Sequence, residues 1–158
     1  ISIDISDSAI EESVVINGVN VTGRLRTPEI SSFVSKISSN QLVREQMVLI
    51  QRKISQDKSI VIDGRDIGTV VFPDADYKFF ITASIKERTK RRFKELQLDG
   101  INTDLYLIEK QIKDRDHLDS TRSNSPLKKA KDAILIDTTH LNIDEQVNLI
   151  LGKINKHN

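Results

Sequence analysis

The sequence predicts an α/β protein in which a parallel β-sheet is flanked by helices. Three short apolar runs, at residues 59–62, 77–81 and 133–136, have the composition of buried parallel strands. Segments with apolar residues at helical spacing lie between and after these runs, and this alternation favours a parallel sheet with right-handed crossovers. The 158 residues are about the length of one domain, long enough to bury a core without disulfides.

The first part of the chain is predicted to be small and rich in β-structure. Residues 1–5 alternate between apolar and polar, as a half-buried strand does, and Asn17-Gly18 between β-branched runs predicts a hairpin. Two helices should follow, because capping residues precede segments with helical spacing. They are expected at about 28–38, after Thr27, and at about 41–55, after Asn40.

The second part of the chain has three segments with helix-capping signals. Ser84 is expected to cap a helix that continues to about Leu98, and Thr103 a helix that ends near His117. Asn142 and Glu145 have the spacing of a capping box, which predicts the start of a final helix.

The composition excludes several classes of function. Without cysteine there are no disulfides, thiolate nucleophiles or cysteine-based metal sites, and three scattered histidines indicate neither zinc nor a catalytic triad. The 24 Lys and Arg balance 23 Asp and Glu, so no overall positive field would attract nucleic acid. Because no apolar run is long enough for a membrane helix and the N-terminal residues do not resemble a signal peptide, we expect a cytoplasmic protein.

Arginines at the ends of predicted elements indicate where an anion could bind. Arg65 and Asp66 directly follow the predicted strand 59–62, and ligands of parallel sheets bind beyond the carboxyl ends of strands. The planar fork of arginine can hold a phosphate through two parallel bonds. An alternative interpretation is a plain hairpin turn at Asp63-Gly64, between 59–62 and 67–72, with solvated neighbours.

A second group of arginines lies early in the helix predicted after Ser84. Arg88, Arg91 and Arg92 are spaced i, i+3 and i+4, so they share one face of that helix. The alternative interpretation is an ordinary solvated face, which runs of charge on a helix usually form.

One long motif, residues 63–75 (DGRDIGTVVFPDA), is more specific than any capping or turn signal. Four other segments agree with it in order along the chain: residues 22–29, 43–45, 87–92 and 115–138. Together they resemble the bacterial cytidylate kinase family from about Val14 to the end of the chain.

This resemblance implies a P-loop nucleoside monophosphate kinase fold with an inserted monophosphate-binding region and a lid. The implied reaction transfers the γ-phosphoryl group of ATP to CMP or dCMP, with Mg²⁺. The CMP-binding insert is expected at residues 1–55, and the core at 56–158 with its lid at about 84–122. The expected partners are these small substrates, without nucleic acid, membrane or obligate protein partner.

The resemblance also assigns roles to residues of this sequence. Cytosine presents an amino donor beside ring acceptors, so its recognition needs a carboxylate and an arginine together. The implied base contacts are Asp66, Arg44 and Ser35; the sugar contacts are Arg115 and Asp119; the CMP phosphate contacts are Arg65 and Arg122; and the lid arginines that neutralise the transferring phosphates are Arg88, Arg91 and Arg92.

The phosphate-binding motif G-x-x-x-x-G-K-[ST] does not occur in these 158 residues. In the family it precedes the segment corresponding to Ile1, so we expect a C-terminal portion that lacks the first strand and the P-loop and contributes no metal ligand. These residues by themselves are then expected to have little kinase activity and an exposed, self-associating sheet edge. Two alternatives remain: a kinase for another monophosphate, UMP or AMP, and a non-catalytic nucleotide- or RNA-binding module. The second is less favoured because the chain has only five Phe and two Tyr for base stacking.

Overall fold

The computed structural model describes residues 3–8, 11–25, 27, 30, 33–34, 37–38 and 40–155, with the backbone alone for 4–8 and 11–12. The chain divides into two compact units, residues 1–61 and 62–158, and each is described by itself. The predicted boundary between insert and core lies at 55/56. Among the described residues, no helix combines the length and apolar character needed to cross a bilayer.

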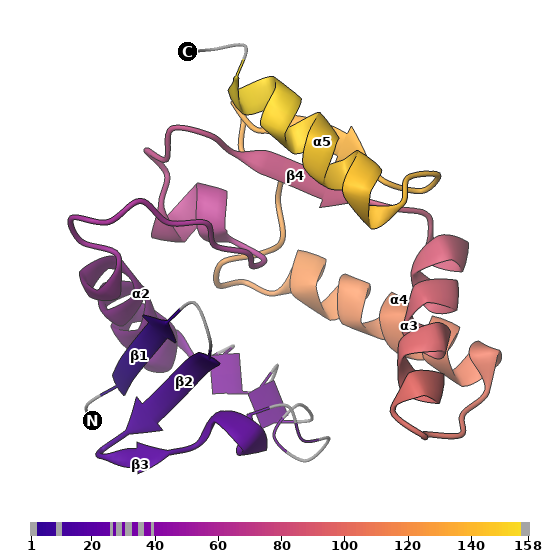
Figure 1. Cartoon of the computed structure of the whole chain (residues 1–158), viewed down its shortest axis with the longest axis horizontal. Coiled ribbons are helices and arrows are strands. Elements are labelled where there is room, and N and C mark those ends of the chain that lie inside the picture. Colours follow the sequence, from indigo (N-terminus) through magenta and orange to yellow (C-terminus); the bar gives the residue numbers. More distant parts are fainter. Residues whose placement is uncertain are drawn as a thin grey trace. The chain divides into compact units, whose positions relative to one another are not determined.

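The first unit contains a three-stranded antiparallel sheet in the order β1 (Ile3–Ser8), β2 (Glu11–Ile16) and β3 (Val19–Asn20) (Figure 1). β2 and β3 are joined by Asn17 and Gly18, with φ of 50° and 81°. Two successive positive φ angles are what a type I′ turn requires, so the predicted hairpin is confirmed. Beyond β3, the Thr22 hydroxyl accepts a bond from the Val14 amide at 2.9 Å, where a short 3₁₀ helix, Thr22–Arg24, begins.

Helix α2 (Gln41–Ile54) is the last helix in the described part of the first unit, and it confirms the helix predicted at 41–55. The Asn40 side chain accepts from the Val43 amide at 3.3 Å, which satisfies one of the donors left open at a helix start. The helix predicted at 28–38 falls largely outside the described residues.

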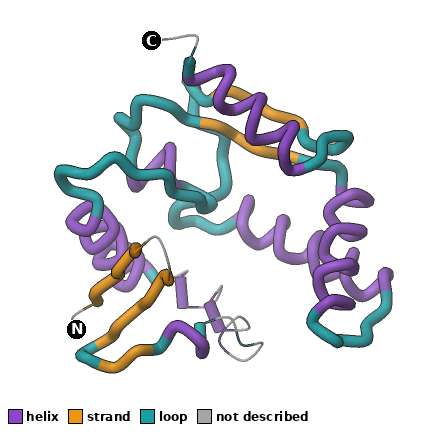
Figure 2. Tube along the Cα trace, in the orientation of Figure 1, coloured by secondary structure: helices purple, strands orange, loops and turns teal. Residues whose placement is uncertain are grey.

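The second unit is built on two parallel strands, β4 (Phe79–Thr82) and β5 (Ile134–Asp137) (Figure 2). The predicted strands 77–81 and 133–136 are therefore confirmed, with shifted ends. The pairing extends past both ends, because the Ile134 amide donates to the Lys78 carbonyl and the Thr138 amide to the Thr82 carbonyl, each at 2.8 Å. Ile136 is 2% exposed and contributes to the core with Val71 and Ile108.

The prediction of a strand at residues 59–62 is wrong. Residues 59–64 have no regular structure, and the Val61 side chain is fully exposed. An isolated apolar run becomes a strand only where a neighbour accepts its backbone bonds, and no strand pairs with this run within the described ranges. The alternative hairpin at Asp63-Gly64 is wrong too, because Ile67–Val71 form a π-helical turn, η2, instead of a second strand.

Three helices follow the first strand of this sheet: α3 (Ile85–Leu98), α4 (Leu105–Thr121) and α5 (Ile143–Ile154). The caps predicted at Ser84 and Asn142 are confirmed, and Asn142 and Glu145 form a reciprocal capping box. For α4 both predicted ends are wrong. Asp104 is the cap in place of Thr103, since its carboxylate accepts from the Tyr106 amide at 2.7 Å. The helix also continues past His117 to Thr121.

The packing of these helices places the polar residues discussed below. α3 and α4 pack against each other, and α5 runs along the β4–β5 sheet (Figure 1). The last turn of α5 is joined to the sheet by the Tyr77 hydroxyl, which donates to the Ile154 carbonyl at 3.2 Å. The start of α3 and the start of α5 both follow directly from strand ends, so the polar groups of the two connections are brought together.

Candidate functional site

The segment that carries Arg65 and Asp66 leads into η2. The Asp66 carbonyl accepts from the amides of Thr69, Val70 and Val71 at 3.2, 2.8 and 3.3 Å, and Asp66 is 3% exposed. Three amides on one carbonyl close a wide turn, and such π-type turns are frequent at functional sites. The sequence therefore places a buried carboxylate directly beside an arginine.

Lys78 closely approaches Gly68, which lies on the same turn. A Cβ at Gly68 would lie 3.2 Å from Cδ and 3.3 Å from Cγ of Lys78, which is tighter than nine in ten such contacts in proteins. The Lys78 ammonium contacts the Pro73 carbonyl and the Asp132 carboxylate, so its stem is held across the turn. The buried Lys78 stem thus fixes η2 against the strand that follows it.

Three arginine side chains surround the carboxylate of Asp119, which lies in the last turn of α4. Its carboxylate lies 2.9 Å from Arg65 Nε, 3.8 Å from Arg115 Nε and 4.0 Å from Arg122 Nη1. We call Arg65, Arg115, Asp119 and Arg122 the Asp119 cluster. Three positive groups around one carboxylate leave an excess of positive charge, so the cluster has the electrostatics of an anion site.

The loop after α4 fixes one member of this cluster. Arg122 Nε donates to the Ser125 carbonyl at 2.7 Å, and the Leu127 amide donates to the Asp119 carbonyl at 2.7 Å. The side chains of Arg122 and Asp119 are 15% and 9% exposed, whereas those of Arg65 and Arg115 are 41% and 62% exposed. Arg122 and Asp119 are thus the buried members of the cluster, whereas Arg65 and Arg115 are open to solvent.

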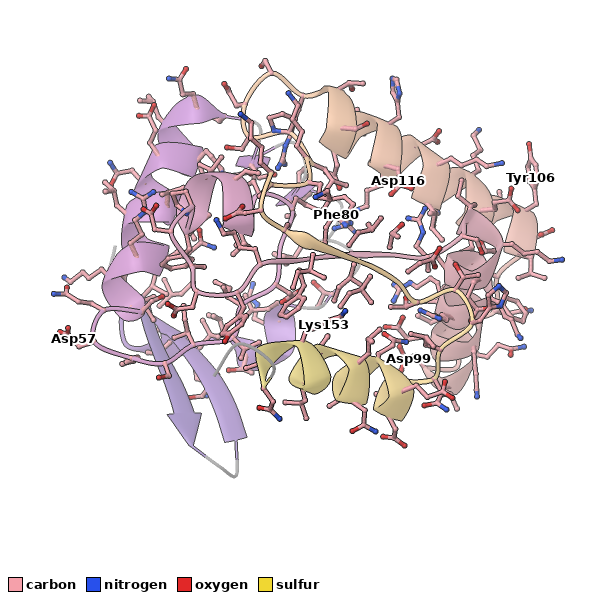
Figure 3. The ribbon with its side chains drawn as sticks, turned by 90° about the horizontal axis from the view of Figure 1, so that it is seen from above. Asp57, Phe80, Asp99, Tyr106, Asp116 and Lys153 are labelled. Carbon is pink, nitrogen blue, oxygen red and sulfur yellow. The ribbon has the colours of Figure 1, made fainter. Side chains whose placement is uncertain are left out.

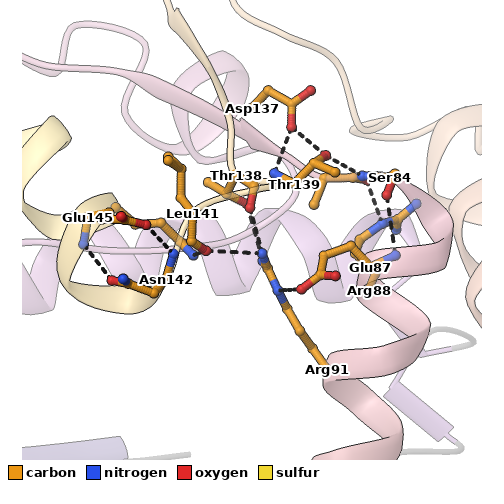
Figure 4. Close-up of polar contacts among 12 residues, drawn as sticks. Ser84, Glu87, Arg88, Arg91, Asp137, Thr138, Thr139, Leu141, Asn142 and Glu145 are labelled. Carbon is orange, nitrogen blue, oxygen red and sulfur yellow. Dashed lines mark hydrogen bonds and ion pairs between the residues drawn. The ribbon is translucent and has the colours of Figure 1, made fainter.

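The three lid arginines share the predicted helix but have different partners. Arg88 makes a bidentate pair with Asp116 of α4, at 3.0 and 2.6 Å, and its Nε donates to the Ala83 carbonyl. Figure 3 labels Asp116 on α4. Arg92 makes an exposed pair with Glu95 at 2.8 Å. Arg91 points to the end of β5 (Figure 4). Their predicted contact with phosphate stays a prediction.

The other predicted site residues lie in or near the first unit. Arg44 is on α2, where its amide donates to the Asn40 carbonyl at 3.0 Å. Ser35 lies outside the described residues.

Two residues that the sequence did not single out are Asp116 and Thr138, the partners of Arg88 and Arg91. Both were inside the segment 115–138 that carries the resemblance, but neither lies at helical spacing from its arginine. Their role depends on contacts between elements that are distant in the chain, and no local signal marks such contacts.

The second unit is an α/β structure with an arginine-rich cluster around one carboxylate, whose net positive charge suits an anionic ligand. A model of the family described as cytidylate kinase matches residues 2–156. The cytidylate kinase of Bacteroides fragilis is 47% identical over 156 residues, which are 99% of this chain and 68% of that protein. Those of Lactobacillus johnsonii and Enterococcus faecalis are 48% and 49% identical, over 98% and 90% of this chain and 67% and 63% of theirs.

The chain belongs to the cytidylate kinase family. It spans about two-thirds of the length of these relatives.

Proposed function

We propose that the protein is a nucleoside monophosphate kinase with the P-loop fold, which transfers the γ-phosphoryl group of ATP to CMP or dCMP and releases CDP or dCDP and ADP. The observation that carries the proposal is the family match over residues 2–156, together with relatives named cytidylate kinase that are 47–49% identical. The Asp119 cluster supports it, because a nucleoside monophosphate presents both a dianionic phosphate and sugar hydroxyls.

The Asp119 cluster has donors and an acceptor for both parts of CMP. In the proposed complex Arg65 and Arg122 clamp the phosphate, since each guanidinium can give it two parallel bonds. Arg115 donates to a sugar hydroxyl, and the Asp119 carboxylate accepts from one. Arg65 forms an ion pair with Asp119 in the structure, so it exchanges part of that contact for the phosphate when CMP binds.

Base selection is proposed to depend on Asp66 and Arg44, with Ser35 as a further contact. A carboxylate accepts from the exocyclic amino group of cytosine, while an arginine donates to its ring acceptors. Uracil has an oxygen where cytosine has that amino group. An oxygen facing the buried Asp66 carboxylate would lose a bond and be repelled, and sites of this kind discriminate strongly.

Phosphoryl transfer needs charge neutralisation more than covalent chemistry, and the lid is proposed to supply it. Arg92 is half-exposed and paired only with an exposed glutamate of its own helix, an interaction that is cheap to break. Arg88 must leave the Asp116 carboxylate to bind phosphate oxygens. Both partners are anionic oxygen pairs, so the guanidinium group makes the same kind of bidentate contact before and after the exchange.

Mg²⁺ is proposed to enter with ATP. Within the residues that the structure describes, no group of three or more His, Asp or Glu side chains could hold a metal ion. We assign no step to a metal held by this part of the chain. A cytoplasmic location, where CMP and ATP occur, agrees with the absence of cysteine.

The proposal is tested by product formation in the natural protein that contains these residues. With ATP as donor we expect CMP and dCMP to be phosphorylated far faster than UMP or AMP. A preference for UMP or AMP would support the alternative kinase, and no phosphorylation of any monophosphate would contradict a kinase function.

A variant assigns the base contact. Asp66→Ala should weaken CMP binding strongly and ATP binding little, as measured by calorimetric titration of each nucleotide. Equal losses for the two nucleotides would show that Asp66 does not face the cytosine base.

A further inference from the structure

The guanidinium group of Arg91 is bonded along most of its edge to main-chain and side-chain oxygens. Nη2 donates to the carbonyls of Thr138 and Leu141 at 2.5 and 3.4 Å, and Nη1 donates to the Thr138 hydroxyl at 3.2 Å. Nε donates to the Glu87 carboxylate at 3.0 Å, one turn back on α3 (Figure 4). Four bonds occupy most of the five N–H donors that an arginine has.

The main partner of Arg91 is deeply buried. Thr138 is 1% exposed, and its hydroxyl donates to the Thr82 carbonyl at 3.0 Å while it accepts from Arg91. The same Thr82 carbonyl accepts from the Thr138 amide at 2.8 Å. The Arg91 side chain is thus connected through one hydroxyl to the ends of both β5 and β4.

Further contacts join the start of α3, residues 137–141 at the end of β5, and the start of α5. The Ser84 amide, at the start of α3, donates to the Thr139 hydroxyl at 2.9 Å, and that hydroxyl donates to Asp137 at 2.6 Å. The Leu141 carbonyl, which accepts from Arg91, also accepts from Gln146 in the first turn of α5 at 3.1 Å. The segment from Asp137 to Leu141 is therefore held from α3 on one side and from α5 on the other.

The next arginine on the same helix has none of these features. Arg92 makes a single pair with Glu95, and both side chains are at least half-exposed. Arg91 therefore differs from Arg92 in what it would lose on turning to a phosphate. Turning would break three bonds, two of them to the buried Thr138, and would leave its carbonyl with only the longer bond from the Leu141 amide, at 3.2 Å. Each bond lost at a buried group is costly.

We propose that Arg91 is a positioning residue, which fixes the segment 138–141 after β5 to the first turns of α3, and that it does not bind the transferred phosphate. The proposal rests on the proposed kinase function in one respect: nucleotides of open parallel sheets bind beyond the carboxyl ends of strands, where this segment lies. Arg91 then acts on nucleotide binding through the geometry of residues 138–141.

The guanidinium shape is essential to this role. One planar group reaches a hydroxyl and two carbonyls at fixed angles, which the single ammonium of a lysine cannot reproduce. A phosphate ligand is less demanding, because lysine still supplies a positive charge there. Arg91→Lys therefore separates the two roles.

The test begins with amide hydrogen exchange of the nucleotide-free natural protein, followed peptide by peptide by mass spectrometry. In Arg91→Lys and Arg91→Ala we expect amides in 138–141 to exchange roughly tenfold faster, the size expected for loss of charge-assisted bonds. Thr138→Val keeps the shape of the side chain and removes the shared hydroxyl, and it should raise exchange in the same peptides. Arg92→Ala is the matched control, with the same charge change on the same helix, and should leave 138–141 unchanged.

Kinetics of CMP phosphorylation supply the second measurement. For a positioning residue, Arg91→Lys and Arg91→Ala should be similar, with KM for a nucleotide raised more than kcat is lowered. Unchanged exchange in both Arg91 variants would overturn the proposal. So would a kcat lost in Arg91→Ala and largely kept in Arg91→Lys, because that result identifies a phosphate ligand.

The exchange measurement needs no substrate. If the wild-type protein phosphorylated no monophosphate, the kinase function would fail while the role of Arg91 in holding residues 138–141 would still be decided. Should Arg91→Ala not fold, Arg91→Lys and Thr138→Val give the same decision.

Discussion

The Asp119 cluster allows a quantitative prediction for Asp119→Asn, a substitution that keeps the size of the side chain and removes its charge. In the wild type the Asp119 carboxylate forms ion pairs with Arg65, Arg115 and Arg122, with nitrogen–oxygen distances of 2.9, 3.8 and 4.0 Å, and its side chain is 9% exposed. An asparagine side chain keeps the shape of Asp119 but carries no charge to pair with Arg65. The variant therefore loses charge interactions without leaving a cavity.

The loss can be estimated contact by contact. An ion pair with a partly exposed arginine contributes up to about 1 kcal/mol, so removing the charge of Asp119 costs the Arg65 contact about 1 kcal/mol. The Arg115 side chain is 62% exposed and the Arg122 contact is long, so together they contribute about 0.5 kcal/mol. The sum of about 1.5 kcal/mol corresponds to a fall in Tm of about 3–6 °C for a chain of this size.

The assay is thermal unfolding of the wild type, Asp119→Asn and a matched control, Asp114→Asn. Asp114 lies on the same helix, is exposed, and has no ion pair in the part of the chain that the structure describes. The control should change Tm by less than about 1 °C, as surface substitutions usually do. Equal changes in the two variants would refute the reasoning, since they would show that burial and convergence of charge at Asp119 have no energetic effect.

A second arm separates loss of charge from loss of packing. Without the carboxylate, three guanidinium groups face each other with less compensation, so an added anion should bind there more tightly. We expect inorganic phosphate to raise the Tm of Asp119→Asn more than that of the wild type, as binding to the folded state requires. A variant that phosphate does not rescue better than wild type would indicate a packing defect.

Three further predictions concern other polar contacts. Arg65→Ala should weaken CMP binding much more than cytidine binding in calorimetric titrations, because the phosphate clamp is lost; equal weakening would place Arg65 away from the phosphate. Asn142→Ala removes the capping box of α5 and should destabilise the protein by about 1 kcal/mol, a fall in Tm of about 2–4 °C, whereas an unchanged Tm would mean that the cap is dispensable. The third prediction concerns acid. Bonds from the Thr139 side chain and then its backbone amide hold the pKa of the Asp137 carboxyl below its usual value of 3.8. The stabilisation from this carboxylate is therefore present above pH 3.8 and is lost as the pH falls through the lowered pKa. Asp137→Asn should lose less stability than the wild type between pH 6 and acid unfolding, and parallel Tm profiles would contradict this.

The helices that were predicted well have their signals within a few residues. Ser84 and Asn142 accept from amides three residues along, so the sequence alone locates the starts of α3 and α5. Thr103 and Asp104 are both good capping residues, and the choice between them is made by the path of the chain into α4. Neighbouring signals of equal strength leave an uncertainty of one residue that local rules do not remove.

The strand predicted at 59–62 shows the opposite case. Its composition is that of a buried strand, but composition cannot supply the neighbour that pairs with it. The parallel strands β4 and β5 do have each other, and their predictions were confirmed. A strand therefore needs a suitable local pattern, and whether it forms depends on a pairing strand that is distant in the sequence.

In the candidate site, too, residues within one motif could be predicted from the sequence, whereas contacts between distant segments could not. Arg65 and Asp66 were identified from one continuous motif. The convergence of Arg65 on Asp119, and of Arg91 on Thr138, joins segments that only the fold brings together, so the sequence indicated the residues and not these pairs.

The turn η2 also restricts how this protein can vary. It starts from the carbonyl of Asp66 and ends on Val71, and both residues are nearly inaccessible to solvent, at 3% and 0%. A five-residue turn held at two buried ends accepts many substitutions between them but no change of length. Natural variants of this protein should therefore differ at residues such as Thr69 by replacement, while insertions and deletions accumulate in exposed connections such as residues 99–103 instead.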